Sequence, residues 1–117
     1  MNIAAIILGM AALGGLMMVG IRLSGSPLPP TWLAIGHGLI AVTGLATLAY
    51  AAVDPGIPQM AQIALGVIVL AAMGGSLMFV LFHLRGRALP VPLMLGHAAL
   101  ASAGLGMLLF TVYQASV

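Results

Sequence analysis

Four long apolar runs without a single charged side chain set the strongest limit on how this chain can fold. They cover residues 2–21, 31–53, 59–82 and 91–113. At a rise of about 1.5 Å per residue, about 20 residues are enough to cross the ~30 Å hydrocarbon core of a bilayer. The first run lacks the positively charged start of a secretory signal, so we expect it to remain in place as a helix. The sequence therefore predicts four transmembrane helices.

The supply of charged side chains is too small for a water-soluble fold. Water-soluble domains carry about 25% Asp, Glu, Lys and Arg, whereas this chain is 3% charged and 63% hydrophobic. The lipid bilayer is therefore the expected partner of most of its surface. Three arginines and one aspartate give a net charge of +2, without the clustered basic patch that would bind nucleic acid. The lack of cysteine excludes disulfides, thiolate ligands and iron–sulfur clusters.

The second half of the chain resembles the first. An offset of 60 residues aligns segment 11–15 with 71–75 and pairs Gly36, His37, Ala41 and Gly44 with Gly96, His97, Ala101 and Gly104. In the turn between these matches the best offset is 61, which places one extra residue in the second turn. We therefore expect two parallel repeats of one helical hairpin, residues 1–53 and 59–114, within a single membrane domain 1–117. Short connections favour an up-and-down bundle, so the predicted fold class is an all-α integral membrane protein with a four-transmembrane-helix bundle.

Charges lie unevenly on the predicted loops. All three arginines fall in or beside the turns within the repeats, and the only acidic residue, Asp54, lies in the loop between the repeats. By the positive-inside rule, the turns face the cytoplasm and both termini lie outside it. We expect a multi-pass protein of a bacterial-type inner membrane. Three aromatic residues fit an interfacial anchoring belt: Trp32, Tyr50 and Tyr113.

Two histidines occupy matching places inside the predicted spans. His37 and His97 lie about seven residues, or roughly 10 Å, below the cytoplasmic boundary. Each shares a helical face with small residues at i+4 and i+7, where another helix or a flat ligand can approach closely. An ionisable side chain at this depth usually faces the bundle interior and indicates a functional site. His83 differs, because it ends its helix near the interface.

One hypothesis is that His37 and His97 supply the two axial nitrogens of a haem b between the second and fourth helices. Bundle cores hold cofactors between facing helices, and histidine is a common haem ligand. Arg85 and Arg87, on the same side, would contact the haem propionates, and His83 is a spare ligand. The general pattern resembles membrane b-type cytochromes, in which histidines on a four-helix bundle hold haem. This resemblance implies an electron carrier.

Other interpretations use the same residues. Both intramembrane histidines could be structural, each satisfied by a hydrogen bond to Thr43, Ser102 or a backbone carbonyl. A three-histidine zinc site is disfavoured because His83 lies at a different depth, and we assign no metal-ion site. Proton-coupled transport would normally use a carboxylate or cation inside the membrane, and the spans contain neither. They also hold no Ser–His–Asp set for hydrolysis.

The short loops decide which role we favour. They are too short to form a domain outside the membrane, so any protein partner must be met by helix surfaces or turns. We expect a small, non-enzymatic subunit or accessory protein of a larger membrane complex, or of a homo-oligomer. Electron transfer through haem b is the first alternative, and a small transporter is the second.

Overall fold

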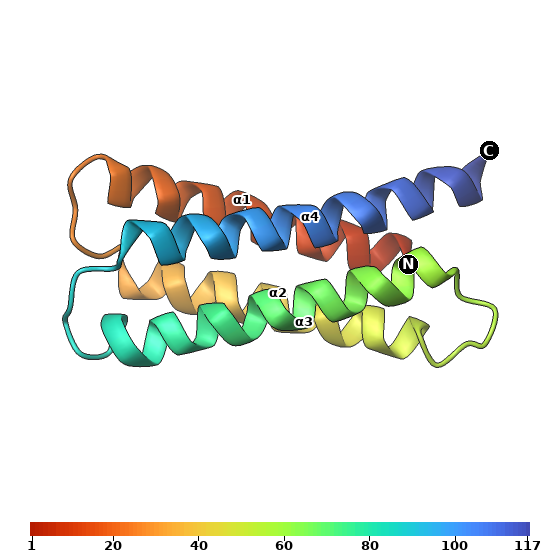
Figure 1. Cartoon of the computed structure of the whole chain (residues 1–117), viewed down its shortest axis with the longest axis horizontal. Helices are drawn as coiled ribbons and strands as arrows, with labels where there is room; N and C mark the ends of the chain where they lie inside the picture. The colour runs from red at the N-terminus through yellow and green to blue at the C-terminus, as the bar shows by residue number, and fades with distance from the viewer.

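The computed structural model describes all residues 1–117 and consists of four long helices (Figure 1). They are α1 (Asn2–Leu23), α2 (Thr31–Ala51), α3 (Gln59–Met78) and α4 (Val91–Ser116), and a π-helical turn, η1 (Phe79–His83), continues α3. Each helix is long and apolar enough to span a membrane, which confirms the four predicted segments. The molecule measures 45 × 22 × 22 Å. Its length matches a bilayer with headgroups, about 40–45 Å thick.

Proline and glycine mark the helix boundaries. Pro30, Pro58 and Pro90 stand directly before α2, α3 and α4, with φ of −56°, −58° and −64°. Proline is suited to this place because its ring already holds a near-helical φ and the missing N–H would have no partner in the first turn. After α1 and η1, Gly25 and Gly86 adopt φ of +112° and +61°. Only glycine takes these left-handed conformations without strain. A glycine at each of these places therefore lets the chain leave the helix and turn back.

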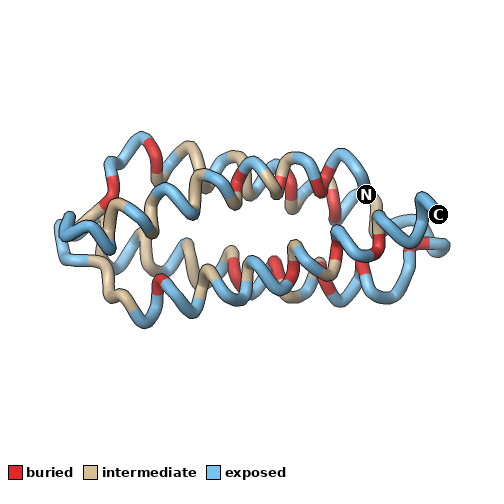
Figure 2. The backbone as a smooth tube through the Cα atoms, turned by 90° about the horizontal axis from the view of Figure 1, so that it is seen from above, coloured by how far each residue is buried: buried red, intermediate tan, exposed pale blue.

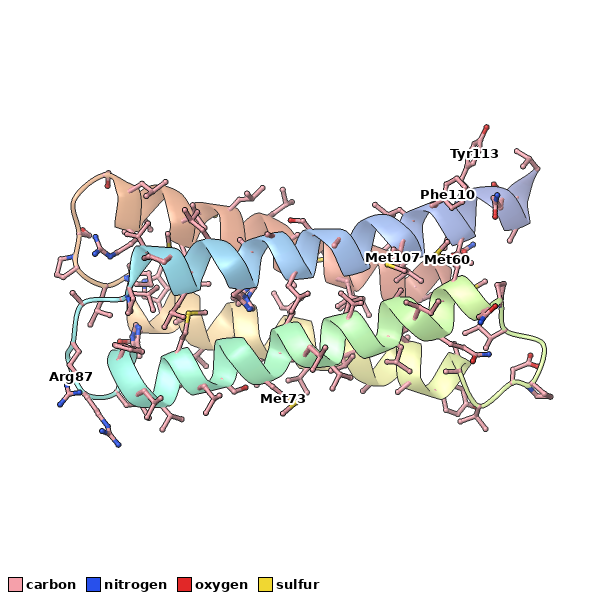
Figure 3. All side chains as sticks on the ribbon, viewed as in Figure 1. Met60, Met73, Arg87, Met107, Phe110 and Tyr113 are labelled. Atoms are coloured by element: carbon pink, nitrogen blue, oxygen red, sulfur yellow. The ribbon has the colours of Figure 1, made fainter.

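The helices pack as a bundle in which neighbours in sequence are neighbours in space. Helix α1 packs on α2 and α3 on α4, while α1–α4 and α2–α3 contacts join the two hairpins. Helices α2 and α4 therefore stand diagonally opposite. The two turns within the hairpins lie at one end of the bundle, and the loop 52–58 and both termini lie at the other (Figure 1). Arg87 and Tyr113 mark these opposite ends in Figure 3. We call them the turn end and the terminal end.

Two glycines let the helices of each hairpin come close. A Cβ added to Gly44 would lie 2.7 Å from Leu8 Cγ, and one added to Gly104 would lie 2.6 Å from Ile68 Cγ1. Both separations are shorter than any van der Waals contact, so neither position has room for a larger residue. This confirms that the face carrying each histidine and glycine is the face on which the neighbouring helix packs.

Burial is unequal along the bundle. The main hydrophobic cluster lies in the terminal half, and most buried positions in Figure 2 lie there too. Its members are Ala4, Ala5, Leu8, Leu48, Ile57, Ala61, Ala64, Ile68 and Leu108. In the turn half, the glycines that face the histidine of the neighbouring helix, Gly15 and Gly75, are only half-buried. The main cluster therefore ends before the level of the histidines, and single residues such as Leu33 and Met94 are buried beyond it, toward the turn end.

The turn end holds the hydrogen bonds that join the hairpins. Arg22 Nε donates to Leu89 O at 2.8 Å, and Leu89 N donates to Pro27 O at 3.0 Å. At the end of α3, the π-helical turn η1 contains one residue more than a regular helical turn. Leu84 N donates there to Phe79 O, five residues earlier, at 2.9 Å. The extra residue that the sequence alignment placed in the second turn is therefore taken up before it, at the end of the helix.

The close helix contact at Gly104 can be tested with a matched pair of variants. We expect Gly104→Ala to lower the free energy of unfolding by about 1–3 kcal/mol, because the added methyl must displace buried Ile68. Gly106→Ala, on the same helix, should be neutral or stabilising because its Cβ would meet no atom within 4 Å. Reversible unfolding in mixed detergent micelles measures both changes. Equal stability of the two variants would contradict the close packing.

Candidate functional site

The two intramembrane histidines make the same hydrogen bond in their respective hairpins. His37 Nδ1 on α2 lies 2.8 Å from Ala11 O on α1, and His97 Nδ1 on α4 lies 2.8 Å from Ala71 O on α3. A carbonyl oxygen can only accept, so Nδ1 must carry the proton in both rings. In the neutral form, each Nε2 then carries no proton and has a free lone pair. Of the partners considered for these two rings, backbone carbonyls are the ones used, and Thr43 donates to Leu39 O instead.

Glycine on the facing helix makes room for each ring. A Cβ on Gly15 would lie 3.2 Å from His37 Cε1, and one on Gly75 would lie 2.9 Å from His97 Cε1. Each glycine stands four residues after the alanine whose carbonyl the histidine bonds, directly above that carbonyl on the helix surface. A side chain there would cover the carbonyl. The missing Cβ is therefore what allows the imidazole to reach it.

The two rings approach each other across the bundle. Their centroids are 6.2 Å apart, and their planes are inclined by 82°. No hydrogen bond joins them, and neither Nε2 has a partner elsewhere in the chain. Since no buried polar atom lacks a partner, neither Nε2 is sealed off by protein atoms. Each therefore borders space that another atom can enter.

Open space also surrounds the histidine pair. A Cβ added to Gly38, the half-buried neighbour of His37, would meet nothing within 4 Å. On the other hairpin, His97 lines an open groove of ≈ 380 Å³ on the outer side of the seam between α3 and α4. The histidines thus have open space beside Gly38 and along the α3–α4 seam.

His83 lies apart from this pair. Its Nε2 shares a 3.0 Å hydrogen bond with Thr31 Oγ1, and its ring stacks on Phe79 with centroids 5.1 Å apart. No three ligating side chains gather in a group that could hold a metal ion. The structure therefore brings together His37 and His97, and it places His83 in the contact between the two hairpins.

The arginines also divide into two kinds. Arg85 and Arg87 are exposed in the turn after η1, and their side chains make no hydrogen bond within the chain. Arg22, which sequence reasoning did not assign to the site, is half-buried and reaches Leu89 O in the other hairpin. The sequence places all three arginines in or beside the turns, but only the structure separates the half-buried Arg22 from the exposed Arg85 and Arg87.

Comparisons with protein-family models, with curated proteins and with solved structures gave no match. The site must therefore be interpreted from its own geometry.

The shared hydrogen bond predicts one tautomer for both histidines. In cofactor-free protein labelled with ¹⁵N-histidine, we expect His37 and His97 to carry the proton on Nδ1, as one-bond N–H couplings would report. Gly75→Ala should displace His97 from Ala71 O and leave His37 unchanged, because the new methyl would lie 2.9 Å from the His97 ring. Gly74→Ala is the control, since its Cβ would meet nothing within 4 Å. An unchanged His97 signal in Gly75→Ala would refute this arrangement.

Proposed function

We propose that this chain is a membrane electron carrier that holds one haem b between α2 and α4, with His37 and His97 as the axial ligands. The observation that carries the proposal is the pairing of two rings with free Nε2 atoms at a 6.2 Å centroid separation. Two imidazoles on opposite sides of one metal atom, with bonds of about 2 Å, have ring centroids roughly 6 Å apart. The near-perpendicular planes are compatible with such ligation.

The second nitrogen of each ring supports the same assignment. A histidine that ligates a metal usually donates its other N–H to a carbonyl or carboxylate, which fixes the tautomer and orients the ring. Ala11 O and Ala71 O fill this role for His37 and His97. A purely structural pair would satisfy the Nδ1 atoms equally well, but it would leave two lone pairs without a partner inside an apolar bundle. Ligation accounts for both nitrogens.

The space and charge near the rings fit a flat anionic cofactor. Half-buried glycines surround the pair, and the packed core lies in the other half of the bundle. All positive side chains lie toward the turn end, and the only carboxylate side chain, Asp54, lies in the opposite loop. We assign a propionate to Arg22 in place of Arg85 and Arg87, because Arg22 is the arginine that is half-buried between the hairpins. His83 is engaged with Thr31 and needs no ligand role.

The haem would supply reversible one-electron chemistry, and the chain would supply its position and surroundings. With both axial places taken by histidine, no open place would remain for a substrate, so we propose no enzymatic activity. The loops are too short to bring in a soluble donor domain. Electrons would therefore be exchanged with a partner inside a larger membrane complex, or with a second copy of the chain.

The topology completes this proposal. We infer that the two hairpins are parallel copies of one unit, because they share the Ala–His hydrogen bond at an offset of 60 residues. The turn end, with all three arginines, would face the cytoplasm of a bacterial-type cell, and both termini would lie outside the inner membrane. The haem would then lie in the cytoplasmic half of the bilayer.

An absorption spectrum tests the haem. Protein purified in mild detergent from haem-replete cells should show a Soret band, and dithionite should add the sharp α and β bands of a six-coordinate b-type haem. His37→Ala and His97→Ala should each abolish the six-coordinate spectrum, whereas His83→Ala should keep it. Haem-free wild-type protein that is folded by circular dichroism and gel filtration would refute the proposal.

A cavity variant separates ligation from folding. His97→Gly removes the imidazole but keeps the backbone, so free imidazole added at about 10 mM should restore the six-coordinate spectrum if the ring is a ligand. His83→Gly with the same addition is the control and should show no change. Haem that binds His97→Gly as it binds the wild type, without imidazole, would show that His97 is not an axial ligand.

Single cysteines test the orientation, because the chain has none of its own. We introduce Ser26→Cys in the first turn and Ser116→Cys at the end of α4, both exposed. A membrane-impermeant maleimide should label Ser116→Cys in intact spheroplasts and Ser26→Cys only in inverted vesicles. The opposite pattern would reverse the proposed orientation.

A further inference from the structure

An apolar groove runs along the outer seam between α3 and α4. It is the ≈ 380 Å³ cavity that His97 lines, and 8 of its 12 lining residues are hydrophobic. The groove begins at Leu70 and Leu100 and reaches Phe82 and Pro92, close to the turn end. Along a helix, the 12 steps from Leu70 to Phe82 cover about 18 Å. This is close to the ~15 Å depth of one leaflet's hydrocarbon.

Two facing glycines hollow out the groove. A Cβ added to Gly74 on α3 or to Gly96 on α4 would meet nothing within 4 Å. Leu77, with an exposed fraction of 59%, and Leu93, with 52%, form the rims. Because most of the lining faces outward, the groove opens to the bilayer, and its natural filling is a hydrocarbon chain.

Two positive charges without an internal counterion stand beyond one end of this groove. Arg85 and Arg87 follow Phe82 by three and five residues, are exposed, and make no side-chain hydrogen bond. The chain has a single carboxylate side chain, Asp54, which lies at the terminal end of the bundle. The first hairpin differs, because its turn 24–30 contains no charged residue and Arg22 is bound to Leu89 O.

We propose that the α3–α4 groove is a binding site for one anionic phospholipid of the surrounding bilayer. The acyl chain fills the groove over Gly74 and Gly96, and the headgroup phosphate pairs with Arg85 and Arg87 at the interface. The complementarity of charge selects an anionic lipid over a zwitterionic one, since a net negative headgroup leaves the attraction to the two arginines uncompensated. The apolar groove makes the site specific for a lipid rather than for free phosphate.

Native mass spectrometry of the detergent-solubilised holoprotein tests this site. Titration with phosphatidylglycerol should give one tightly retained lipid per chain, and phosphatidylcholine should be retained more weakly. The double variant Arg85→Gln, Arg87→Gln should weaken phosphatidylglycerol binding by about 20- to 30-fold, the product of roughly fivefold for each arginine. Inorganic phosphate at millimolar concentration should not displace the lipid. Displacement by phosphate would overturn the assignment to a lipid.

A matched pair of groove variants tests the acyl-chain contact. Gly96→Leu fills the α3–α4 groove and should abolish the retained lipid. Gly36→Leu, at the corresponding place in the first hairpin, also enters open space and should leave it bound. Circular dichroism and gel filtration establish that each variant is folded. The proposal would be overturned if Gly96→Leu or the arginine variant retained the lipid as well as the wild type does. It would also be overturned if Gly36→Leu lost the lipid to the same extent as Gly96→Leu. The arginine variant should keep its Soret band, so the lipid site and the haem site fail independently.

Discussion

The hydrogen bond from each intramembrane histidine to an alanine carbonyl of its own hairpin is the contact on which the rest of the site depends. Inside lipid no water can satisfy a ring nitrogen, so the protein must provide the partner. The carbonyl at Ala11 or Ala71 already accepts a bond within its own helix, but a carbonyl oxygen has a second lone pair. Using it fixes the tautomer and leaves the lone pair of Nε2 without a partner in the chain.

That bond requires a particular residue pattern on two helices. The carbonyl of an α-helix lies beneath the side chain four residues later, so only glycine at Gly15 and Gly75 leaves it open to an imidazole. Helix α2 or α4 must also approach closely enough to deliver the ring, which Gly44 and Gly104 permit farther along. The histidine, the alanine whose carbonyl it bonds and the two glycines that make room for the contact are therefore needed together. Each hairpin contains one such set.

The sequence was sufficient for the fold because lipid imposes a simple rule. Uncharged runs of about 20 residues between proline and glycine become helices whatever their detailed packing, and all four observed helices begin where they were predicted. The meeting of His37 and His97 was also predictable from their equal depth. The carbonyl partners were not, because every residue has a carbonyl and only the relative height of two helices decides which one the ring reaches.

The contacts between the hairpins were harder to predict for a related reason. A one-residue shift in an alignment can be taken up in a loop or in a helix, and the choice depends on hydrogen bonds that the sequence does not display. Here the π-turn η1 takes up the residue and ends at His83, which meets Thr31 across the hairpins. At this contact, the correspondence between the two hairpins does not predict which residues meet.

The unequal packing of the two halves has a physical consequence. The terminal half holds the main hydrophobic cluster, which packs residues of all four helices together. In the turn half, the hairpins are joined by the Arg22–Leu89, Leu89–Pro27 and Thr31–His83 hydrogen bonds. A cofactor bound by one histidine from each hairpin would bridge them outside the main hydrophobic cluster. A ligand that binds only the folded bundle stabilises the folded bundle. The free energy of binding such a cofactor would therefore also hold the two hairpins together.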